Sequence, residues 1–267
     1  TATVTMNPVT EFASMKKGDT VQCAVEVRDT LGNTSDSITS DGQLVENALP
    51  LMLDAVVTSA PGSANVDSTL TCTATGSDLD VDDTLSYTYT WTLLDIGELT
   101  SETSTSETST LVLADYVGSG VERDQTVRCD VTVSDGDDED GPEGDEVTLG
   151  NAPPTVSVVS FDDAAGGRAT VESTLRCAVS GADSDGDDIT YNYAVTSAVA
   201  GVSPAASGYV SDTHWDFDIS LLAPAYAAGE TFTCTVTPKD SEGTSGDAAV
   251  SEELTLQNSL PVVTGAV

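Results

Sequence analysis

The sequence predicts an all-β protein built from tandem antiparallel β-sandwich domains. The first observation is a recurring segment around Cys23, Cys129 and Cys234, which stand 106 (129 − 23) and 105 (234 − 129) residues apart. A fixed period of this length indicates copies of one domain. The second is that Cys72 precedes Cys129, and Cys177 precedes Cys234, by the same 57 residues (129 − 72 and 234 − 177). The third is a series of short segments that alternate apolar and polar residues, as half-buried strands do.

Each copy of the recurring segment has the same features. It begins with threonine and an apolar residue, has cysteine at its fourth position, and ends with an aspartate six residues after the cysteine. The copies are 20–29, 126–135 and 231–240. The alternation within them predicts one strand per copy.

The composition favours thin cores and a surface that attracts cations. Only 5% of the 267 residues are aromatic, so each core is expected to consist mostly of Val, Leu, Ala and Thr. The 45 acidic and 8 basic residues give a formal charge of −37, and we expect no nucleic acid or anionic lipid as a partner. Such a surface attracts divalent cations, but the low lysine content is equally consistent with a protein from a high-salt habitat.

The cysteine spacing predicts one disulfide in each complete copy, Cys72–Cys129 and Cys177–Cys234. No C-x-x-C pair is present, so a zinc site is not expected. Disulfides indicate an oxidising compartment, and the predicted location is extracellular or at a cell surface. Cys23 has the second-cysteine position of its copy, and its partner would lie before the first residue of the chain. No membrane insertion is expected within this segment.

Proline-containing tetrapeptides divide the chain at domain spacing, at 47–50, 151–154 and 258–261. Because proline restricts its own backbone and that of the residue before it, we expect short stiff linkers that hold the domains end to end in a rod. The predicted units are the C-terminal part of one repeat, two complete repeats and the first strand of a following repeat. Their bounds are 1–48, 49–152, 153–260 and 261–267.

The order of elements is clearest in the second repeat. Its predicted strands lie at 51–59, 69–75, 85–93 and 111–113 and around Cys129. An exposed edge or loop is predicted at 101–110, and an acidic loop from Asp135 to Asp145. The third repeat follows the same order, with Val195 in the place of Trp91. In the first copy a strand is predicted over 20–27.

Three residues of the second repeat, Cys72, Trp91 and Cys129, resemble the cysteine–tryptophan–cysteine trio of immunoglobulin-like domains. The order D-x-D-x-D-D, then T-Y-x-Y, then an aspartate closing the sixth strand is similar to tandem immunoglobulin-like, PKD-like and cadherin-like repeats of bacterial surface proteins. The resemblance covers nearly the whole chain and implies immunoglobulin-like sandwiches. The third repeat lacks the tryptophan, and neither the W-D-F-G-D-G of PKD modules nor the D-x-N-D-N of cadherin junctions is present.

Two acidic turns are the strongest candidates for a binding site. Alternating aspartates in a tight turn direct several carboxylates at one centre, as calcium requires with its about six to eight oxygen ligands. In an immunoglobulin-like sandwich the loop after the sixth strand lies at the same end, as does the preceding linker with Asn47 or Asn151. The predicted calcium ligands are Asp78, Asp80, Asp82, Asp83, Asp135 and Asp137 in the second repeat, and Asp183, Asp185, Asp187, Asp188 and Asp240 in the third.

Calcium bound there would stiffen the junctions between repeats. The alternative is that the acidic turns are simply solvated. Val81 stands where the third repeat has Gly186, and no glutamate is found at the twelfth position of an EF-hand loop.

The remaining features favour plain structural roles. His214, the only histidine, is expected on an exposed strand. Trp215 and Phe217 are expected in the core, with a sugar-stacking platform as the alternative. No nucleophile motif or phosphate loop is present, and carboxylates that share one solvent-facing environment do not separate into an acid and a base. We therefore expect a protein that is not an enzyme.

The sequence favours a structural and adhesive function. The chain is expected to be part of an extracellular rod of acidic, disulfide-bonded repeats in a bacterial surface fibre, stalk or adhesin. Its expected partners are neighbouring repeats or copies of itself in a fibre, and surface glycans or proteins. The alternative is a set of non-catalytic carbohydrate-binding or spacer modules of a secreted hydrolase.

Overall fold

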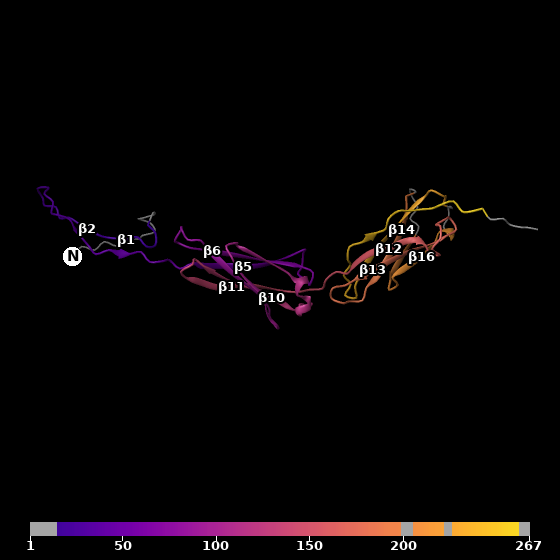
Figure 1. Cartoon of the computed structure of the whole chain (residues 1–267), viewed down its shortest axis with the longest axis horizontal. Coiled ribbons are helices and arrows are strands. Elements are labelled where there is room, and N and C mark those ends of the chain that lie inside the picture. The colour runs from indigo at the N-terminus through magenta and orange to yellow at the C-terminus, as the bar shows by residue number, and fades with distance from the viewer. Residues whose placement is uncertain (1–14, 199–204, 222–225, 262–267) are drawn as a thin grey trace, which may run out of the picture. The chain divides into compact units, whose positions relative to one another are not determined.

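A computed structural model describes residues 15–198, 205–221 and 226–261 (Figure 1). The chain divides into two compact units. Residues 1–64, 68–121 and 125–148 form the first unit, and residues 65–67, 122–124 and 149–267 form the second. Antiparallel sheets make up both units, which confirms the predicted all-β sandwich class. The strand predicted over 261–267 falls almost entirely outside the described residues.

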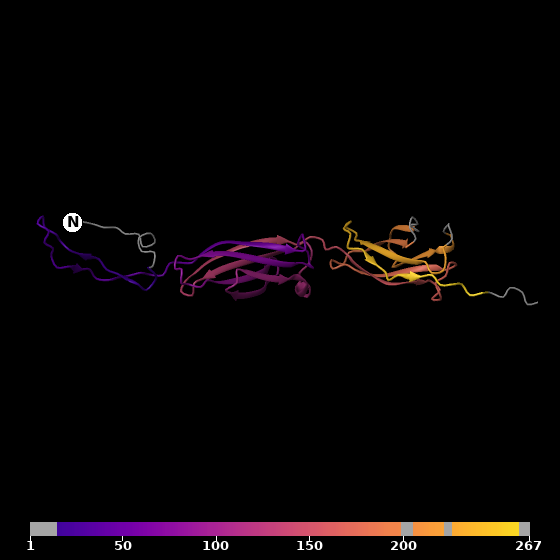
Figure 2. The same ribbon diagram turned by 90° about the horizontal axis from the view of Figure 1, so that it is seen from above.

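The complete repeat of the first unit forms a sandwich of two antiparallel sheets (Figure 2). Its elements are β5 (Leu51–Ala60), β6 (Thr69–Ser77), β7 (Ser86–Leu93), β8 (Gly97–Ser104), β9 (Thr108–Val112), the 3₁₀ helix η1 (Leu113–Ser119), β10 (Thr126–Ser134) and β11 (Glu139–Thr148). One sheet has the order β5-β6-β9 and the other the order β11-β10-β7-β8. Buried residues alternate with half-buried ones along β7 and β10, as the period of two in the sequence predicts.

The second unit contains a sandwich of the same topology. Its elements are β12 (Thr155–Asp163), β13 (Thr174–Ala182), β14 (Thr190–Ser197), β15 (Ala205–Val210), β16 (His214–Asp218), the 3₁₀ helix η2 (Ile219–Leu221), β17 (Thr231–Lys239), β18 (Ala249–Val250) and β19 (Leu254–Thr255). One sheet has the order β12-β13-β16 and the other the order β15-β14-β17-β18, with β19 also paired to β17. The last strand, continuous as β11 in the first unit, is therefore split into β18 and β19.

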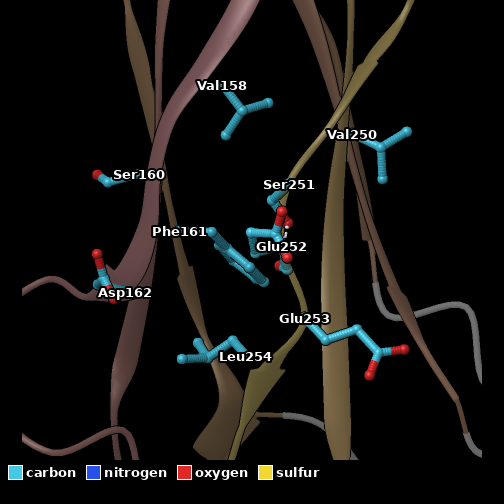
Figure 3. A pocket seen from close by; sticks show the side chains of 9 residues that line it. All are labelled: Val158, Ser160, Phe161, Asp162, Val250, Ser251, Glu252, Glu253 and Leu254. Atoms are coloured by element: carbon cyan, nitrogen blue, oxygen red, sulfur yellow. Dashed lines mark hydrogen bonds between the residues drawn. The ribbon is translucent and has the colours of Figure 1, made fainter.

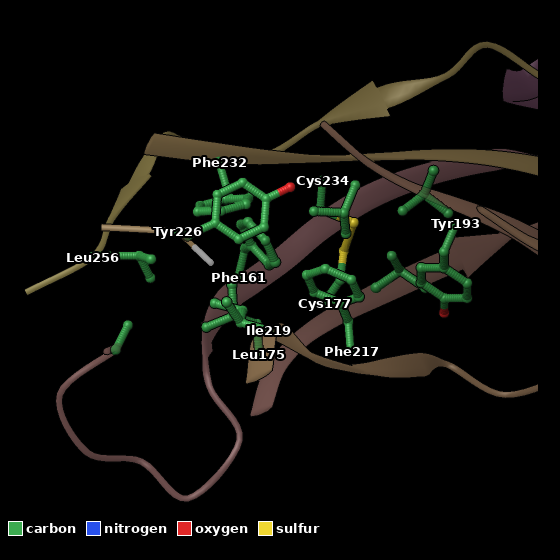
Figure 4. Close-up of a cluster of buried hydrophobic side chains, with 14 of the residues drawn as sticks. Phe161, Leu175, Cys177, Tyr193, Phe217, Ile219, Tyr226, Phe232, Cys234 and Leu256 are labelled. Carbon is green, nitrogen blue, oxygen red and sulfur yellow. A yellow bond between two sulfur atoms is a disulfide. The ribbon is translucent and has the colours of Figure 1, made fainter. Parts of the chain in front are cut away.

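One disulfide joins the two sheets of each sandwich, as predicted. Cys72 of β6 is bonded to Cys129 of β10. Cys177 of β13 is bonded to Cys234 of β17, as Figure 4 shows. Each bond spans 57 residues, and closing such a loop in the unfolded chain stabilises the fold by about 4 kcal/mol. The two disulfides indicate that the protein folds outside the reducing cytoplasm.

The space beside the disulfide is filled differently in the two sandwiches. In the first unit Trp91 of β7 is fully buried, and its indole N–H donates a hydrogen bond of 3.1 Å to the hydroxyl of Ser109 on β9. In the second unit Val195 takes the place of Trp91, opposite the second cysteine. Trp215 of β16 takes the place of Ser109, opposite the first cysteine. The tryptophan therefore comes from the other sheet.

Trp215 packs against two aromatic residues of the third-repeat core. Its ring centroid lies 6.3 Å from that of Tyr193 and 5.7 Å from that of Phe217. Tyr193 and Phe217 belong to the buried cluster drawn in Figure 4, and Trp215 packs against this cluster while remaining partly exposed. His214 precedes it at the exposed start of β16.

The predicted acidic loop from Asp135 to Asp145 is wrong in its extent. The loop ends at Asp138, and β11 begins at Glu139 and pairs with β10. Residues 139–148 contain eight acidic, glycine or proline residues, so their local propensity for a strand is low. Pairing with β10, and contacts of the acidic side chains with β5, outweigh this propensity.

The first copy consists of two short antiparallel pairs. They are β1 (Thr20–Val21) with β4 (Gln43–Leu44), and β2 (Ala24–Val25) with β3 (Ile38–Thr39). The predicted continuous strand over 20–27 is therefore broken. The equivalent strands β10 and β17 are continuous because each pairs along both edges, whereas residues 20–25 pair along one edge in the described part of the chain. Val25 is 55% exposed, and Cys23 is a free, exposed thiol.

Candidate cation sites in the acidic loops

The loop between β6 and β7 is shaped by its own aspartates. The Asp78 carboxylate accepts a hydrogen bond of 2.6 Å from the backbone N–H of Asp80. The Asp80 carboxylate in turn accepts one of 2.7 Å from the backbone N–H of Ala48. Aspartates are suited to such turns because their side chains bond the backbone two residues further on. The loop is thereby attached to the tetrapeptide that precedes the repeat.

The loop between β13 and β14 repeats this design. The Asp183 carboxylate accepts hydrogen bonds from the backbone N–H groups of Asp185, at 2.9 Å, and Asp187, at 3.3 Å. The Asp185 carboxylate accepts one of 2.6 Å from the N–H of Ala152. Equivalent hydrogen bonds from the loop and from the linker occur in both repeats, so the repeated sequence determines this loop structure.

The aspartate that closes the sixth strand is held by the linker asparagine. Asp135 accepts hydrogen bonds from the side-chain amide of Asn47 at 2.9 Å and from the backbone N–H groups of Asp137 and Asp138 at 2.8 and 2.7 Å. Backbone hydrogen bonding at Asp138 and the bond from Asn47 lower the pKa of Asp135 to about 2. Asp135 is therefore a stable anion at neutral pH.

Asp240 has the same place in the third repeat. Its carboxylate accepts hydrogen bonds of 2.7 Å from the side-chain amide of Asn151 and from the backbone N–H of Thr244. Burial disfavours the charged form of Asp240, but these hydrogen bonds outweigh burial and lower its pKa. The predicted approach of each linker asparagine to the closing loop is present in both repeats.

A lysine lies among the carboxylates of the second repeat. The Lys17 ammonium contacts the carboxylates of Asp83 at 2.6 Å and Asp137 at 2.8 Å, and the amide oxygen of Asn47 at 3.0 Å. Hydrogen bonds to Asp137 and Asp83 raise the pKa of Lys17. Lys17 therefore joins the loop before β7 to the loop after β10.

Arginine takes the same role in the third repeat. One Arg123 nitrogen, Nη1, lies 2.7 Å from both the Asp187 carboxylate and the side-chain oxygen of Asn151. The hydrogen bond to Asp187 raises the pKa of the Arg123 guanidinium. Lys17 and Arg123 both stand six residues before the cysteine of a recurring segment (23 − 17 and 129 − 123). The sequence analysis did not predict the role of either residue. Their signal is that basic residues are rare in this chain and that these two have the same position in the repeat.

Three carboxylates in each repeat come within 4.8 Å of one another. They are Asp78, Asp80 and Asp83 in the second repeat, and Asp183, Asp187 and Asp240 in the third. Buried carboxylate oxygens without a hydrogen-bond partner occur at Asp78, Asp183 and Asp185 in the described part of the chain. Burial raises the pKa of Asp185. The negative charge at these oxygens is therefore incompletely compensated.

The other predicted ligands lie outside these two groups. Asp82 is exposed and forms an ion pair of 2.8 Å with Lys16. Asp137 is engaged by Lys17, Asp135 by Asn47, and Asp185 by the backbone of Ala152, while Asp188 is exposed.

Carboxylate and amide oxygens are the ligands that calcium prefers, so the two groups fit a divalent cation in kind. The positive charge that lies among these loops is the chain's own, from Lys17 and Arg123. A metal ion would therefore have to displace these side chains or share the carboxylates with them. No helix in the described residues is long and apolar enough to cross a bilayer.

Comparison with solved structures finds a likeness to a crystal structure of the FN1–FN3 domains of chicken CNTN1. The two are 12% identical, the match covers 89% of this chain and 78% of that chain, and the TM-score is 0.35. No protein-family profile and no curated protein matches the chain. The class of fold is given by the chain's own sheets and disulfides. They define repeated immunoglobulin-like β-sandwiches, and a PKD-like or cadherin-like identity is not confirmed.

Proposed function

We propose that this chain is part of a non-catalytic, extracellular structural or adhesive protein made of tandem acidic repeats, such as a bacterial surface fibre, stalk or adhesin. The observation that carries the proposal is repetition. One disulfide-bonded sandwich occurs twice with the same strand order, and the two short pairs of residues 20–44 match its last two strands. Repeated domains of one kind suit a spacer or a display scaffold.

The partners that we propose are neighbouring repeats or other copies of the chain, and glycans or proteins of a surface. The formal charge of −37 disfavours nucleic acid and anionic membranes. Carbohydrate-binding modules of a secreted hydrolase are the second candidate. The packing of Trp215 against Tyr193 and Phe217 favours a core role over an open sugar platform.

Antibody labelling of intact cells of the source organism, with and without protease treatment of their surface, tests the proposal. Surface label that protease removes is the expected result. Label found only after permeabilisation would contradict it. A glycan array with the wild-type chain and Trp215→Ala distinguishes the candidates, since sugar binding lost in this variant would favour the carbohydrate-binding function.

We also propose that the acidic groups bind calcium in competition with Lys17 and Arg123. The support is the approach of three carboxylates within 4.8 Å in each repeat and the buried oxygens without a partner. Calorimetric titration of the whole chain with calcium is expected to show binding, weakened by Asp183→Asn and strengthened by Arg123→Ala. Asp188→Asn, an exposed residue outside the groups, is the matched control. Absence of any heat at millimolar calcium would refute a calcium site.

A further inference from the structure

The first and last strands of the second repeat are joined by carboxylates. Asp145 of β11 accepts a hydrogen bond of 2.9 Å from the backbone N–H of Val57 on β5. Asp140 of β11 accepts one of 2.7 Å from the N–H of Met52 on the same strand. The two strands belong to different sheets, so these bonds close the gap between the sheets on this side of the sandwich.

The third repeat lacks this closure. Ser251 has the place of Asp145, since both lie opposite the second cysteine of their repeat. Its hydroxyl accepts a hydrogen bond of 2.9 Å from the backbone N–H of Cys234, within its own sheet. In the second repeat one residue, Glu146, separates Asp145 from Val147, which pairs with Val127. In the third repeat two residues, Glu252 and Glu253, separate Ser251 from Leu254, which pairs with Phe232. The extra residue makes a bulge in the strand. No hydrogen bond from a side chain of 249–255 to β12 is found among the described residues.

A groove of about 380 Å³ lies between β12 and the residues of this bulge (Figure 3). Its apolar lining comes from Val158, Phe161, Val250 and Leu254, of which Phe161 is buried and Val250 exposed. In Figure 3 the Phe161 ring extends from β12 into the space between the two strands. The volume suits a few side chains of an extended segment and is too small for a folded domain.

The edge of β12 beside the groove is unpaired. Among the residues that the structure describes, β12 is the outermost strand of its sheet and pairs with β13 alone. Phe161 lies opposite Cys177 as Val57 lies opposite Cys72, so its N–H has the position of the one that Asp145 engages in the second repeat. An unpaired edge with free backbone groups is the template on which a peptide can add as a further strand.

The charge of the groove selects its occupant. Asp162, Glu252 and Glu253 line it and are exposed, and none of the described residues that line it is basic. A second copy of this chain has only 8 basic residues against 45 acidic ones, so it offers few cations for these three carboxylates. A segment with alternating aliphatic and basic side chains matches both the apolar lining and the carboxylates.

We propose that this groove binds an extended, basic segment of a partner protein, which adds to β12 as a strand. Its aliphatic side chains pack on the partly exposed Val158 and Leu254 beside the buried Phe161 ring, and its lysines or arginines face the three carboxylates. The inference deepens the proposed adhesive role by naming the chemistry of a partner. The groove proposal and the proposed function can be refuted separately. If the chain lies at the cell surface but does not bind such a segment, only the groove proposal is refuted. If the chain binds the segment but lies inside the cell, only the proposed surface function is refuted.

The test uses the whole chain and an acetylated, amidated peptide Lys-Val-Thr-Val-Lys, titrated by calorimetry and by amide chemical shifts of β12. Binding with shifts at Phe161 is expected. Methylating the peptide's central backbone nitrogens should weaken binding by about tenfold or more, because each blocked N–H removes a strand hydrogen bond. A Glu-Val-Thr-Val-Glu peptide should not bind. Equal affinity for the methylated peptide, or absence of binding by the basic peptide, would overturn the proposal.

Two variants locate the site. Ser251→Asp with deletion of Glu253 restores the closure of the second repeat and should abolish binding. The variant adds one acid and removes one, so its net charge is that of the wild-type chain. Glu252→Lys preserves the backbone and should weaken binding, with Asp188→Lys as its control. Unchanged affinity in Glu252→Lys would overturn the proposal. Sedimentation gives a second test: self-association of the wild-type chain that Ser251→Asp removes would also overturn it, because a second copy would then occupy the groove.

Discussion

The two complete repeats have the same sandwich topology, and each contains one tryptophan, but the two tryptophans lie on opposite sheets. The second repeat combines Trp91 on one sheet with Ser109 on the other, and the third combines Val195 with Trp215 at the same two places. One large and one small side chain thus fill the space beside the disulfide in both. The comparison teaches that the fold requires a filled volume at this place rather than a tryptophan at one position.

Removal of the disulfides tests what the two repeats share. Cys72→Ala with Cys129→Ala, and Cys177→Ala with Cys234→Ala, should each destabilise the affected repeat by about 4 kcal/mol, because the closed loops are equally long. Hydrogen–deuterium exchange of each repeat measures the loss separately. A much larger loss in one repeat would show that the surrounding core, and not the loop, determines the effect.

Exchange of the tryptophan between the sheets tests how the repeats differ. Trp91→Val alone should cost the second repeat about 3 kcal/mol through the cavity that it leaves. Adding Ser109→Trp should recover part of this loss, since the pair then matches Val195 and Trp215 of the third repeat. Denaturation of the single and double variants gives the coupling energy. Additive losses would contradict the volume argument.

The closure between first and last strands is the next difference to remove. Asp145→Ala should destabilise the second repeat by about 2 kcal/mol, because it leaves the N–H of Val57 without its partner. Glu139→Ala, an exposed acid on the same strand, is the control and should have little effect. Faster exchange of the Val57 amide in Asp145→Ala alone is the diagnostic measurement.

The basic side chains should have smaller effects. Lys17→Ala and Arg123→Ala each remove a partly exposed ion pair, so a slight loss of melting temperature is expected, less than that of Asp145→Ala. The loss should shrink further in high salt, which screens such pairs. Arg176→Ala removes an exposed pair with Asp216 elsewhere in the third repeat and is the matched control.

The effect of acid should be confined to low pH. The pKa of Asp135 is about 2 in the folded chain against an ordinary 3.8, so the folded state binds fewer protons than the unfolded state between these values. This contribution to stability is complete above about pH 5 and is lost as the pH falls towards 2. Melting temperatures measured from pH 5 to 2 should fall less steeply in Asp135→Asn. Parallel curves for the two proteins would argue against the low pKa.

Patterns that repeat along the chain could be read from the sequence. The sandwich and its disulfides were predicted from the repeat period, the cysteine pairs and the alternation of apolar and polar residues in β7 and β10. The approach of the linkers to the acidic loops was predicted from the position of the linker asparagines. Features set by tertiary contacts could not. Glu139–Thr148 is a strand because β10 and β5 engage it, and Lys17 meets Asp83 across 66 residues of sequence. Calcium binding by the aspartates stays a prediction.

The cross-sheet disulfides also limit how far the protein can lengthen under mechanical load. When a repeat is pulled from its two ends, the 57-residue segment between the cysteines cannot be drawn out while the sulfur–sulfur bond holds. At about 3.5 Å per extended residue, each bond withholds about 200 Å of contour length. A reducing environment would release this hidden length, so the chain can be stretched less far when its disulfides are oxidised.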